Sequence, residues 1–199
     1  MIEIEVKHKI KGKKELKKIK NKLNQIAQFK KKEKELNLVF DSADSSFKKK
    51  GFLLRLRKAS KNTLTFKSKI KGKGKFKERK ETEMQIKDFY RTKKTLEKMN
   101  FEPKFIYEKK RETFELNQTE ILLDELPFIG FYLEIEGNKK SIKEVEEKLG
   151  LKEKNRITKN YLQLFLDYKK KKRLKAENML FYSIKEGSLC LDLEKEKLK

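Results

Sequence analysis

The opening residues 2–7, Ile-Glu-Ile-Glu-Val-Lys, alternate strictly between apolar and charged side chains. Two residues is the repeat of a β-strand, so the apolar side chains share one face and Glu3, Glu5 and Lys7 share the other. Similar patterns return along the chain, mostly at spacings that suit hairpins. They predict an antiparallel sheet of about eight strands at 2–7, 36–41, 52–57, 63–67, 79–84, 105–116, 120–126 and 131–136.

Apolar residues three or four positions apart indicate helices between these strands. Ser141, followed three residues later by Glu144, predicts a capping box at the start of one of them. The charge run 30–35 is expected to be a turn or the start of a strand. The expected helices are 12–28, 87–100, 141–149 and 155–168, with a helical turn at 47–51 and loops at 41–46 and 69–77.

The C-terminal segment 169–199 begins with five basic residues and has weak strand patterning only at 189–193. We expect it to be a loosely attached tail or an added hairpin. The sequence therefore predicts a single domain over residues 1–168, which is long enough to bury a core.

The chain is strongly basic, with 55 Lys and Arg against 31 Asp and Glu and a net charge of +24. Most of this charge is Lys, which is typical of a solvated surface; nucleic-acid binding would need basic residues clustered on one face with stacking aromatics. Cys190 is the only cysteine, so no internal disulfide can form. No apolar run is long enough for a membrane span, and the charged start from Glu3 argues against a secretory signal, so a cytoplasmic protein is expected.

The charged face of the sheet requires an explanation. If the sheet closes into a barrel whose apolar side chains pack outward against helices, the charged side chains line an enclosed tunnel. Like charges in such a place are costly unless a ligand or a metal compensates them. The α+β fold that would meet this condition is a closed, eight-stranded antiparallel barrel with a charged interior, flanked by helices.

The residue types in this face suggest its chemistry. Carboxylates are hard oxygen ligands that suit Mg²⁺ or Mn²⁺ better than zinc, and His8, the only histidine, is expected to be an ordinary strand residue. Arginine and lysine side chains can donate to several phosphate oxygens at once. The acids are Glu3, Glu5, Glu134 and Glu136, and the bases are Arg55, Arg57, Lys67, Lys109 and Arg111.

The order of these motifs resembles the CYTH superfamily, the triphosphate tunnel metalloenzymes, which include class IV adenylyl cyclases and thiamine triphosphatases. The similarity begins with ExExK at 3–7 and extends over about residues 1–168. Its further motifs are FD at 40–41, GxxLRxR at 51–57, LTxK at 64–67, RxExE at 79–83, KxR at 109–111, LD at 123–124 and ExE at 134–136.

The resemblance implies roles for individual residues. Divalent Mg²⁺ or Mn²⁺ would be held by Glu3, Glu5, Glu134 and Glu136. Lys159 is either a further basic group on a helix that plugs the tunnel or a solvated lysine. The triphosphate would be bound by Lys7, Arg55, Arg57, Lys67, Arg79, Lys109 and Arg111, with Lys7 and Arg111 as catalytic residues and Glu81, Glu83 and Asp124 as supporting acids.

The resemblance leaves the reaction open. A class IV adenylyl cyclase-like activity, which converts ATP to cyclic AMP and pyrophosphate, is the first expectation. The alternative is an inorganic or organic (thiamine) triphosphatase, and the third is a non-catalytic module that binds polyphosphate or RNA. The expected partner is a nucleoside triphosphate or another triphosphate, and the expected oligomeric state is a monomer or a homodimer.

Overall fold

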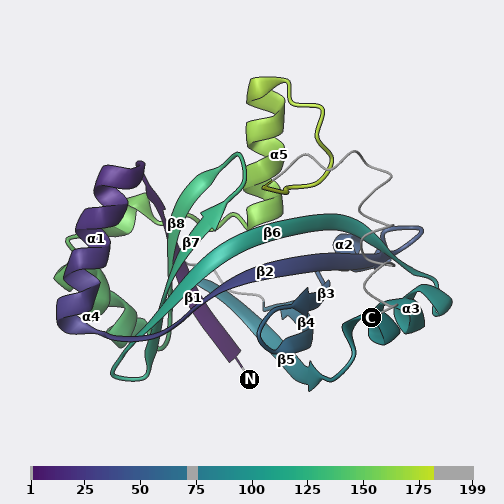
Figure 1. The fold of residues 1–199 in the computed structure, drawn as a ribbon, viewed down its shortest axis with the longest axis horizontal. Helices are drawn as coiled ribbons and strands as arrows, with labels where there is room; N and C mark the ends of the chain where they lie inside the picture. The colour runs from purple at the N-terminus through teal and green to yellow at the C-terminus, as the bar shows by residue number, and fades with distance from the viewer. Residues whose placement is uncertain (1, 71–75, 182–199) are drawn as a thin grey trace, which may run out of the picture.

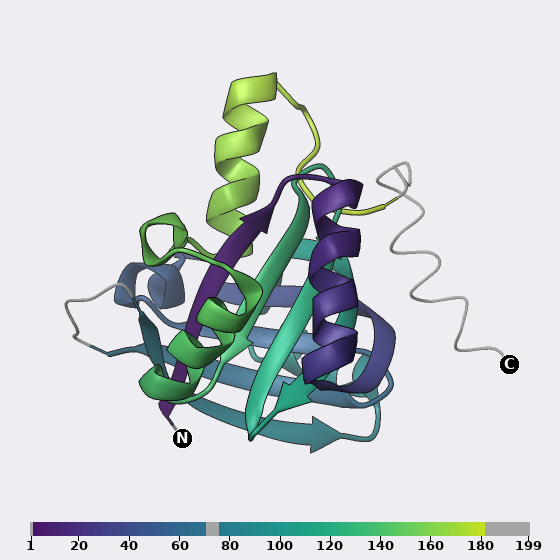
Figure 2. The ribbon, with the colours of Figure 1, turned by 90° about the vertical axis from the view of Figure 1, so that its left-hand side faces the viewer.

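The computed structural model describes residues 2–70 and 76–181. In this part of the chain eight antiparallel strands pair into a closed ring, in the order β1-β5-β4-β3-β2-β6-β7-β8 (Figures 1 and 2). The expected antiparallel sheet of eight strands, closed into a ring, is thus confirmed. The strands are β1 (Ile2–Ile10), β2 (Gln28–Ser42), β3 (Leu53–Lys58), β4 (Asn62–Lys69), β5 (Lys77–Ile86), β6 (Phe101–Leu116), β7 (Thr119–Leu126) and β8 (Gly130–Glu136).

Helices cover the ring from outside. Two of them, α1 and α4, lie together over the flank formed by β1, β7 and β8, whereas α5 stands over the end of the ring near β6 (Figures 1 and 2). The α-helices of the described residues are α1 (Lys13–Ile26), α2 (Ser46–Lys50), α3 (Phe89–Lys98), α4 (Lys139–Leu149) and α5 (Tyr161–Lys172), with a 3₁₀ turn at Glu153–Asn155.

The apolar face of the strands packs outward against these helices. Ile135 on β8 lies opposite Val6 on one side and Ile121 on the other, and all three are buried in one cluster with Ile19 of α1 and Val145 of α4. Each such side chain contributes about 1.5–3 kcal/mol when it is fully buried. Since successive strand residues point to opposite faces, this packing directs the charged side chains to the inside of the ring.

Strand β2 is longer than the sequence predicted, because it includes the charge run 30–35 and begins at Gln28. This run pairs with the second half of β6, in a register that sets Glu33 opposite Arg111 and Glu35 opposite Lys109. Cross-strand pairs of opposite charge stabilise a strand that intrinsic propensity alone does not favour. The expectation of a strand start here is confirmed, and that of a turn is wrong.

Two helix starts differ from prediction. Helix α4 is capped by Asn138, whose Oδ1 accepts from the backbone N–H groups of Lys140 and Ser141, so the predicted Ser141 cap is wrong. Helix α5 begins at Tyr161 rather than at residue 155, with a capping box between Asn160 and Gln163. In both cases an asparagine supplies the cap side chain, and the apolar spacing alone does not mark that position.

The segment after residue 168 is partly structured. Helix α5 continues to Lys172, and residues 178–181 then run along the open edge of β6. Met179 donates its N–H to the carbonyl of Ile106 at 3.0 Å and accepts from the N–H of Glu108 at 2.9 Å. Cys190, the predicted strand at 189–193 and part of the predicted loop at 69–77 lie outside the described residues.

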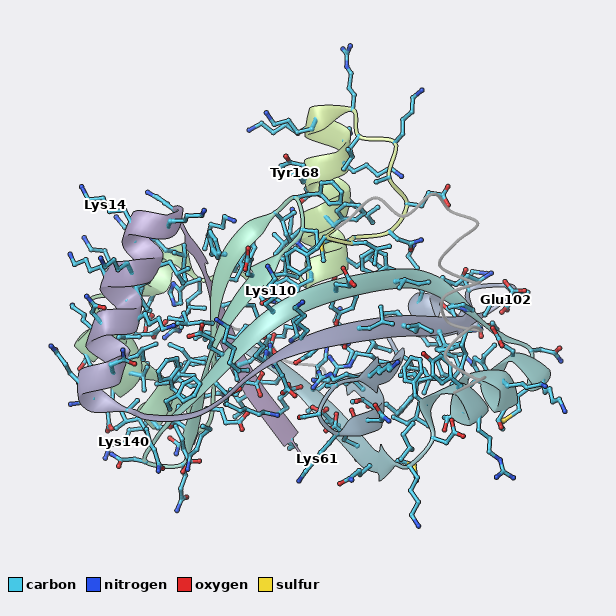
Figure 3. All side chains as sticks on the ribbon, viewed as in Figure 1. Lys14, Lys61, Glu102, Lys110, Lys140 and Tyr168 are labelled. Atoms are coloured by element: carbon cyan, nitrogen blue, oxygen red, sulfur yellow. The ribbon has the colours of Figure 1, made fainter. Side chains whose placement is uncertain are left out.

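The exterior carries lysines on helices and turns in different parts of the chain, such as Lys14, Lys61 and Lys140, which are far apart in Figure 3. Such a spread agrees with a solvated basic surface. Among the described residues no helix has the length and apolar character needed to cross a bilayer.

Candidate functional site

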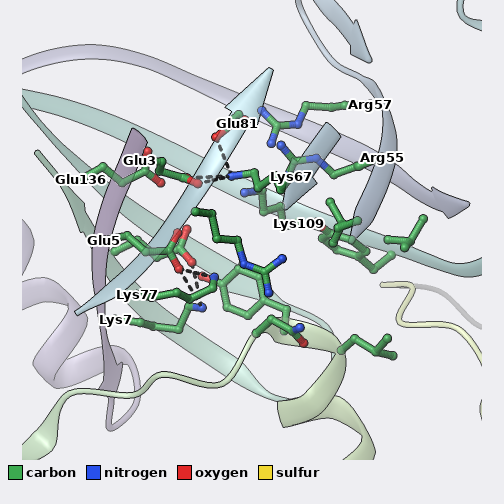
Figure 4. A pocket seen from close by; sticks show the side chains of 18 of the residues that line it. Glu3, Glu5, Lys7, Arg55, Arg57, Lys67, Lys77, Glu81, Lys109 and Glu136 are labelled. Carbon is green, nitrogen blue, oxygen red and sulfur yellow. Dashed lines mark hydrogen bonds and ion pairs between the residues drawn. The ribbon is translucent and has the colours of Figure 1, made fainter. Parts of the chain in front are cut away.

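A cavity of about 230 Å³ lies inside the ring of strands (Figure 4). Its walls are mainly charged, with eight basic and seven acidic side chains, so the numbers of positive and negative groups in the lining nearly balance. The charged lining consists of Lys7, Arg55, Arg57, Lys67, Lys77, Arg79, Lys109 and Arg111, and of Glu3, Glu5, Glu81, Glu83, Glu120, Glu134 and Glu136.

The structure brings almost every predicted site residue to this cavity. Asp124 and the weaker candidate Lys159 are the exceptions. Asp124 lies behind the wall, with 1% of its surface exposed. Its carboxylate accepts hydrogen bonds from Arg111 at 2.6 Å on each oxygen and from the Tyr161 hydroxyl at 2.8 Å. Asp124 therefore positions the groups that line the cavity.

Three of the four predicted metal ligands form a cluster. Glu5 and Glu136 lie opposite each other on β1 and β8, and one carboxylate oxygen from each of Glu3, Glu5 and Glu136 lies within 4.8 Å of the others. Such a group of hard oxygen donors fits a divalent cation like Mg²⁺ or Mn²⁺.

The electrostatics of Glu136 also agree with a site for a cation. Burial, together with the carboxylates of Glu5 and Glu134, raises the pKa of Glu136 to about 8. In the metal-free protein the third carboxyl group therefore holds a proton at neutral pH. A bound cation would remove the repulsion that keeps it there.

Glu134, the fourth predicted ligand, has different neighbours. Its carboxylate lies 3.0 Å from Nζ of Lys7 and 2.5 Å from Nη2 of Arg111. Although burial acts in the opposite direction, Lys7 and Arg111 hold the pKa of Glu134 well below its usual range. Glu134 is thus an ionised partner of Lys7 and Arg111, the two predicted catalytic residues, and it lies outside the three-carboxylate cluster.

The two arginines of the basic wall lie across the cavity from the cluster, whereas the lysine reaches it. Arg55 and Arg57 come from β3, and Lys67 comes from β4 (Figure 4). The Nζ atom of Lys67 lies 2.7 Å from both oxygens of Glu3. Nε of Arg55 is buried and has no hydrogen-bond partner among the described residues. An orphaned guanidinium donor at a cavity wall costs free energy unless an anion accepts from it.

Sequence reasoning missed Glu35, a buried acid that pairs with basic side chains of the cavity lining. Its carboxylate lies 3.2 Å from Arg57 and 3.3 Å from Lys109. Burial opposes its ionisation, but Lys109 and Arg111 outweigh burial and hold the pKa of Glu35 well below its usual range. The signal was its position four residues before Val39 on the same strand, which gives both side chains the same face, and Val39 lines the cavity.

Tyr161 and Lys77 were also missed, and both line the cavity. The Nζ atom of Lys7 lies 4.3 Å from the centre of the Tyr161 ring and donates to the backbone carbonyl of Lys159. The side chain of Lys159 instead pairs with Asp167 in solvent, so this weaker candidate is not brought to the cavity. The first residue of α5 and the segment before it thus hold Lys7, through the Tyr161 ring and the Lys159 carbonyl.

The single histidine belongs to a buried support. Nε2 of His8 lies 2.7 Å from Oε1 of Glu146 on α4, and Arg156 donates to both oxygens of the same carboxylate. The N–H of Ile157 donates to the carbonyl of Lys7 at 2.8 Å. These contacts fix the segment that leads into α5 against the strand that carries the cluster.

Comparison with known proteins agrees with this fold. The family model of the CYTH domain matches residues 1–161, and the chain belongs to the CYTH family. No curated protein matches the sequence.

Several solved structures share the fold. A conserved hypothetical protein from Pyrococcus furiosus has 28% identity and a TM-score of 0.69, covering 81% of this chain and 99% of its own. A Vibrio parahaemolyticus protein provisionally designated an adenylate cyclase has 18% identity and a TM-score of 0.72. The match covers 83% of this chain and 98% of that protein. HpAC1 from Hippeastrum, whose dominant activity is that of a triphosphatase, has 15% identity and a TM-score of 0.63. The match covers 83% of this chain and 95% of that protein.

Proposed function

We propose that this protein is a metal-dependent enzyme that acts on a triphosphate bound in a tunnel inside the ring of strands. The observation that carries the proposal is a carboxylate cluster and a set of basic side chains in one cavity. The cluster of Glu3, Glu5 and Glu136 shares a cavity of about 230 Å³ with eight arginine and lysine side chains, and Arg55 and Arg57 lie across the cavity from it. A triphosphate with its cation matches this arrangement in both sign and size.

The three clustered carboxylates would hold Mg²⁺ or Mn²⁺. Bound there, the metal would act as a Lewis acid that withdraws charge from phosphate oxygens. Arg55, Arg57 and Lys67 would donate to the remaining phosphate oxygens. Arg79 and Lys109 would add donors, and the unpartnered Nε of Arg55 is available to the first anion that enters.

Lys7 and Arg111 are the two cationic side chains that we assign to the reacting phosphorus. Both lie against Glu134, which holds them on the cluster side of the cavity. Glu134 and Glu5 keep the pKa of Lys7 above its usual range although burial acts against this. Lys7 therefore stays a cation and stabilises charge that develops on a phosphate oxygen.

We assign cyclisation of ATP as the first reaction. The 3′-hydroxyl oxygen would attack the α-phosphorus, the bond from that phosphorus to the bridging oxygen would break, pyrophosphate would leave, and the hydroxyl proton would pass to solvent. The supporting observation is an apolar part of the same lining, formed by Val39, Leu53, Phe105 and Leu162, which suits an organic group.

Hydrolysis of a triphosphate is the second candidate. In this reaction water attacks the terminal phosphorus, and the bond from that phosphorus to the bridging oxygen breaks. The diphosphate part of the substrate leaves, the attacked phosphorus becomes orthophosphate, and the proton released from the water passes to solvent. The cavity volume favours it, because about 230 Å³ is below the roughly 300–1,000 Å³ of pockets that enclose drug-sized ligands. An inorganic triphosphate needs less space than a nucleotide.

One assay distinguishes these functions. The protein is incubated with ATP, inorganic triphosphate or thiamine triphosphate, each with Mg²⁺ or Mn²⁺, and cyclic AMP, pyrophosphate and phosphate are measured. Cyclic AMP with pyrophosphate supports the cyclase, and phosphate without cyclic AMP supports the triphosphatase. Binding without turnover under all conditions would leave only the non-catalytic module.

A further inference from the structure

Lys77, at the start of β5, contacts a carboxylate that the proposed function gives to the metal. Its Nζ atom lies 2.5 Å from Oε1 of Glu5, the residue opposite it in the β1–β5 register. Figure 4 shows this ion pair inside the cavity. An ammonium group therefore already brings positive charge to a carboxylate of the three-membered cluster.

Lys67 does the same for a second member of the cluster. Its Nζ atom lies 2.7 Å from both oxygens of Glu3. The third member, Glu136, has no ion pair among the described residues, so two lysines compensate two of the three carboxylates. The protein thus compensates the cluster with its own groups when no metal is bound.

A divalent cation at the cluster would change these contacts. It would repel an ammonium group a few ångströms away, because two like charges at this distance interact strongly in a partly buried site. Lysine has a flexible four-carbon stem, so its ammonium group can turn to another acceptor without movement of the strand. Lys77 points into the cavity, where a phosphate oxygen would be that acceptor.

We propose that Lys77 is a displaceable counter-ion, which neutralises Glu5 in the metal-free protein and is transferred to the triphosphate when the metal binds. This inference rests on the proposed function and extends it, because it makes Lys77 a competitor of the metal and a partner of the substrate. Metal and triphosphate then bind cooperatively, and this coupling is reciprocal.

The test replaces Lys77 with methionine, which keeps the length of the stem and removes the charge. Calorimetric titration with Mn²⁺ alone should give about tenfold tighter binding in Lys77→Met than in the wild type, since the competing charge is gone. Titration with the non-hydrolysable imido analogue of inorganic triphosphate, at saturating Mn²⁺, should give about tenfold weaker binding. A fold defect would weaken both, so the opposite signs identify the counter-ion.

Lys80→Met is the matched control, since Lys80 lies on the same strand, is exposed and is not part of the cavity lining. It should leave both affinities unchanged. Lys77→Gln should reproduce the two opposite shifts, which keeps the test valid if the methionine variant folds poorly. Mn²⁺ binding that is unchanged or weaker in both Lys77 variants overturns the inference, whereas a wild-type protein that binds neither ligand overturns the proposed function itself.

Discussion

The guanidinium group of Arg111 holds the carboxylate of Asp124 with two hydrogen bonds, Nε to Oδ1 and Nη2 to Oδ2, each 2.6 Å long. The two residues lie directly opposite each other on β6 and β7. Because Asp124 is buried behind the cavity wall, this pair fixes the direction from which Arg111 reaches the cavity. The pair links the register of the sheet to the position of Arg111, a predicted catalytic residue.

Asp124→Asn should therefore lower both stability and activity. Breaking a buried pair by removing one charge typically costs about 3–5 kcal/mol, to be measured by urea denaturation. The matched control is Glu125→Gln, because the Lys110–Glu125 pair is adjacent on the same strands but partly exposed. It should cost less than about 1 kcal/mol. Equal effects of the two substitutions would contradict the structural role of Asp124.

The separation of Glu134 from the three-carboxylate cluster gives a second prediction. Glu136→Gln should weaken Mn²⁺ binding at least tenfold, because it removes one hard ligand. Glu134→Gln should change Mn²⁺ affinity much less while lowering kcat, since it leaves Lys7 and Arg111 without their shared partner. Calorimetry with Mn²⁺, paired with turnover measurements on the preferred triphosphate, checks both. A larger loss of metal affinity in Glu134→Gln would return Glu134 to the ligand set.

The raised pKa of Glu136 predicts a dependence of stability on pH in the metal-free protein. A folded-state pKa of about 8, above the usual value of 4.5, means that the folded state binds this proton more tightly. The resulting stabilisation is complete below about pH 4.5 and is lost as the pH rises through about 8. Melting temperatures measured in EDTA should therefore fall between pH 7 and pH 9.

Two comparisons isolate this effect. Glu136→Gln should show a smaller decrease in melting temperature over the same pH range, because its amide does not titrate. Saturating Mg²⁺ in the wild type should also reduce the decrease, since the cation replaces the proton. An identical decrease in the variant would assign the pH dependence to other groups.

Much of this site could be predicted because strand alternation is a local property. Glu3, Glu5 and Lys7 share a face whatever their partners, and the closed ring with helices outside turns that face inward. The different positions of the carboxylates, with Glu134 apart from the cluster that contains Glu5 and Glu136, could not be predicted in the same way. It depends on register across β1 and β8, which places Glu5 opposite Glu136 but Lys7 opposite Glu134.

The missed residues depend on long-range contacts. Glu35 lay in a charge run whose strand character comes from pairing with β6, more than 70 residues away in sequence. Tyr161 reaches the cavity only because the segment before α5 is held against β1. Neither relationship has a signature within a short window of sequence, because both arise from packing between distant elements.

The support that holds this segment gives the last prediction. Glu146 is buried and accepts from Arg156 on both oxygens and contacts His8 at 2.7 Å. Glu146→Gln removes the charge that pairs with a buried guanidinium group, so stability should fall by about 3 kcal/mol or more. Because the segment carries Tyr161, which packs on Lys7, kcat should fall as well. The control is Asp167→Asn, which breaks the exposed pair with Lys159 and should cost less than about 1 kcal/mol. A stable Glu146→Gln protein with wild-type kcat would show that the position of α5 does not depend on this support.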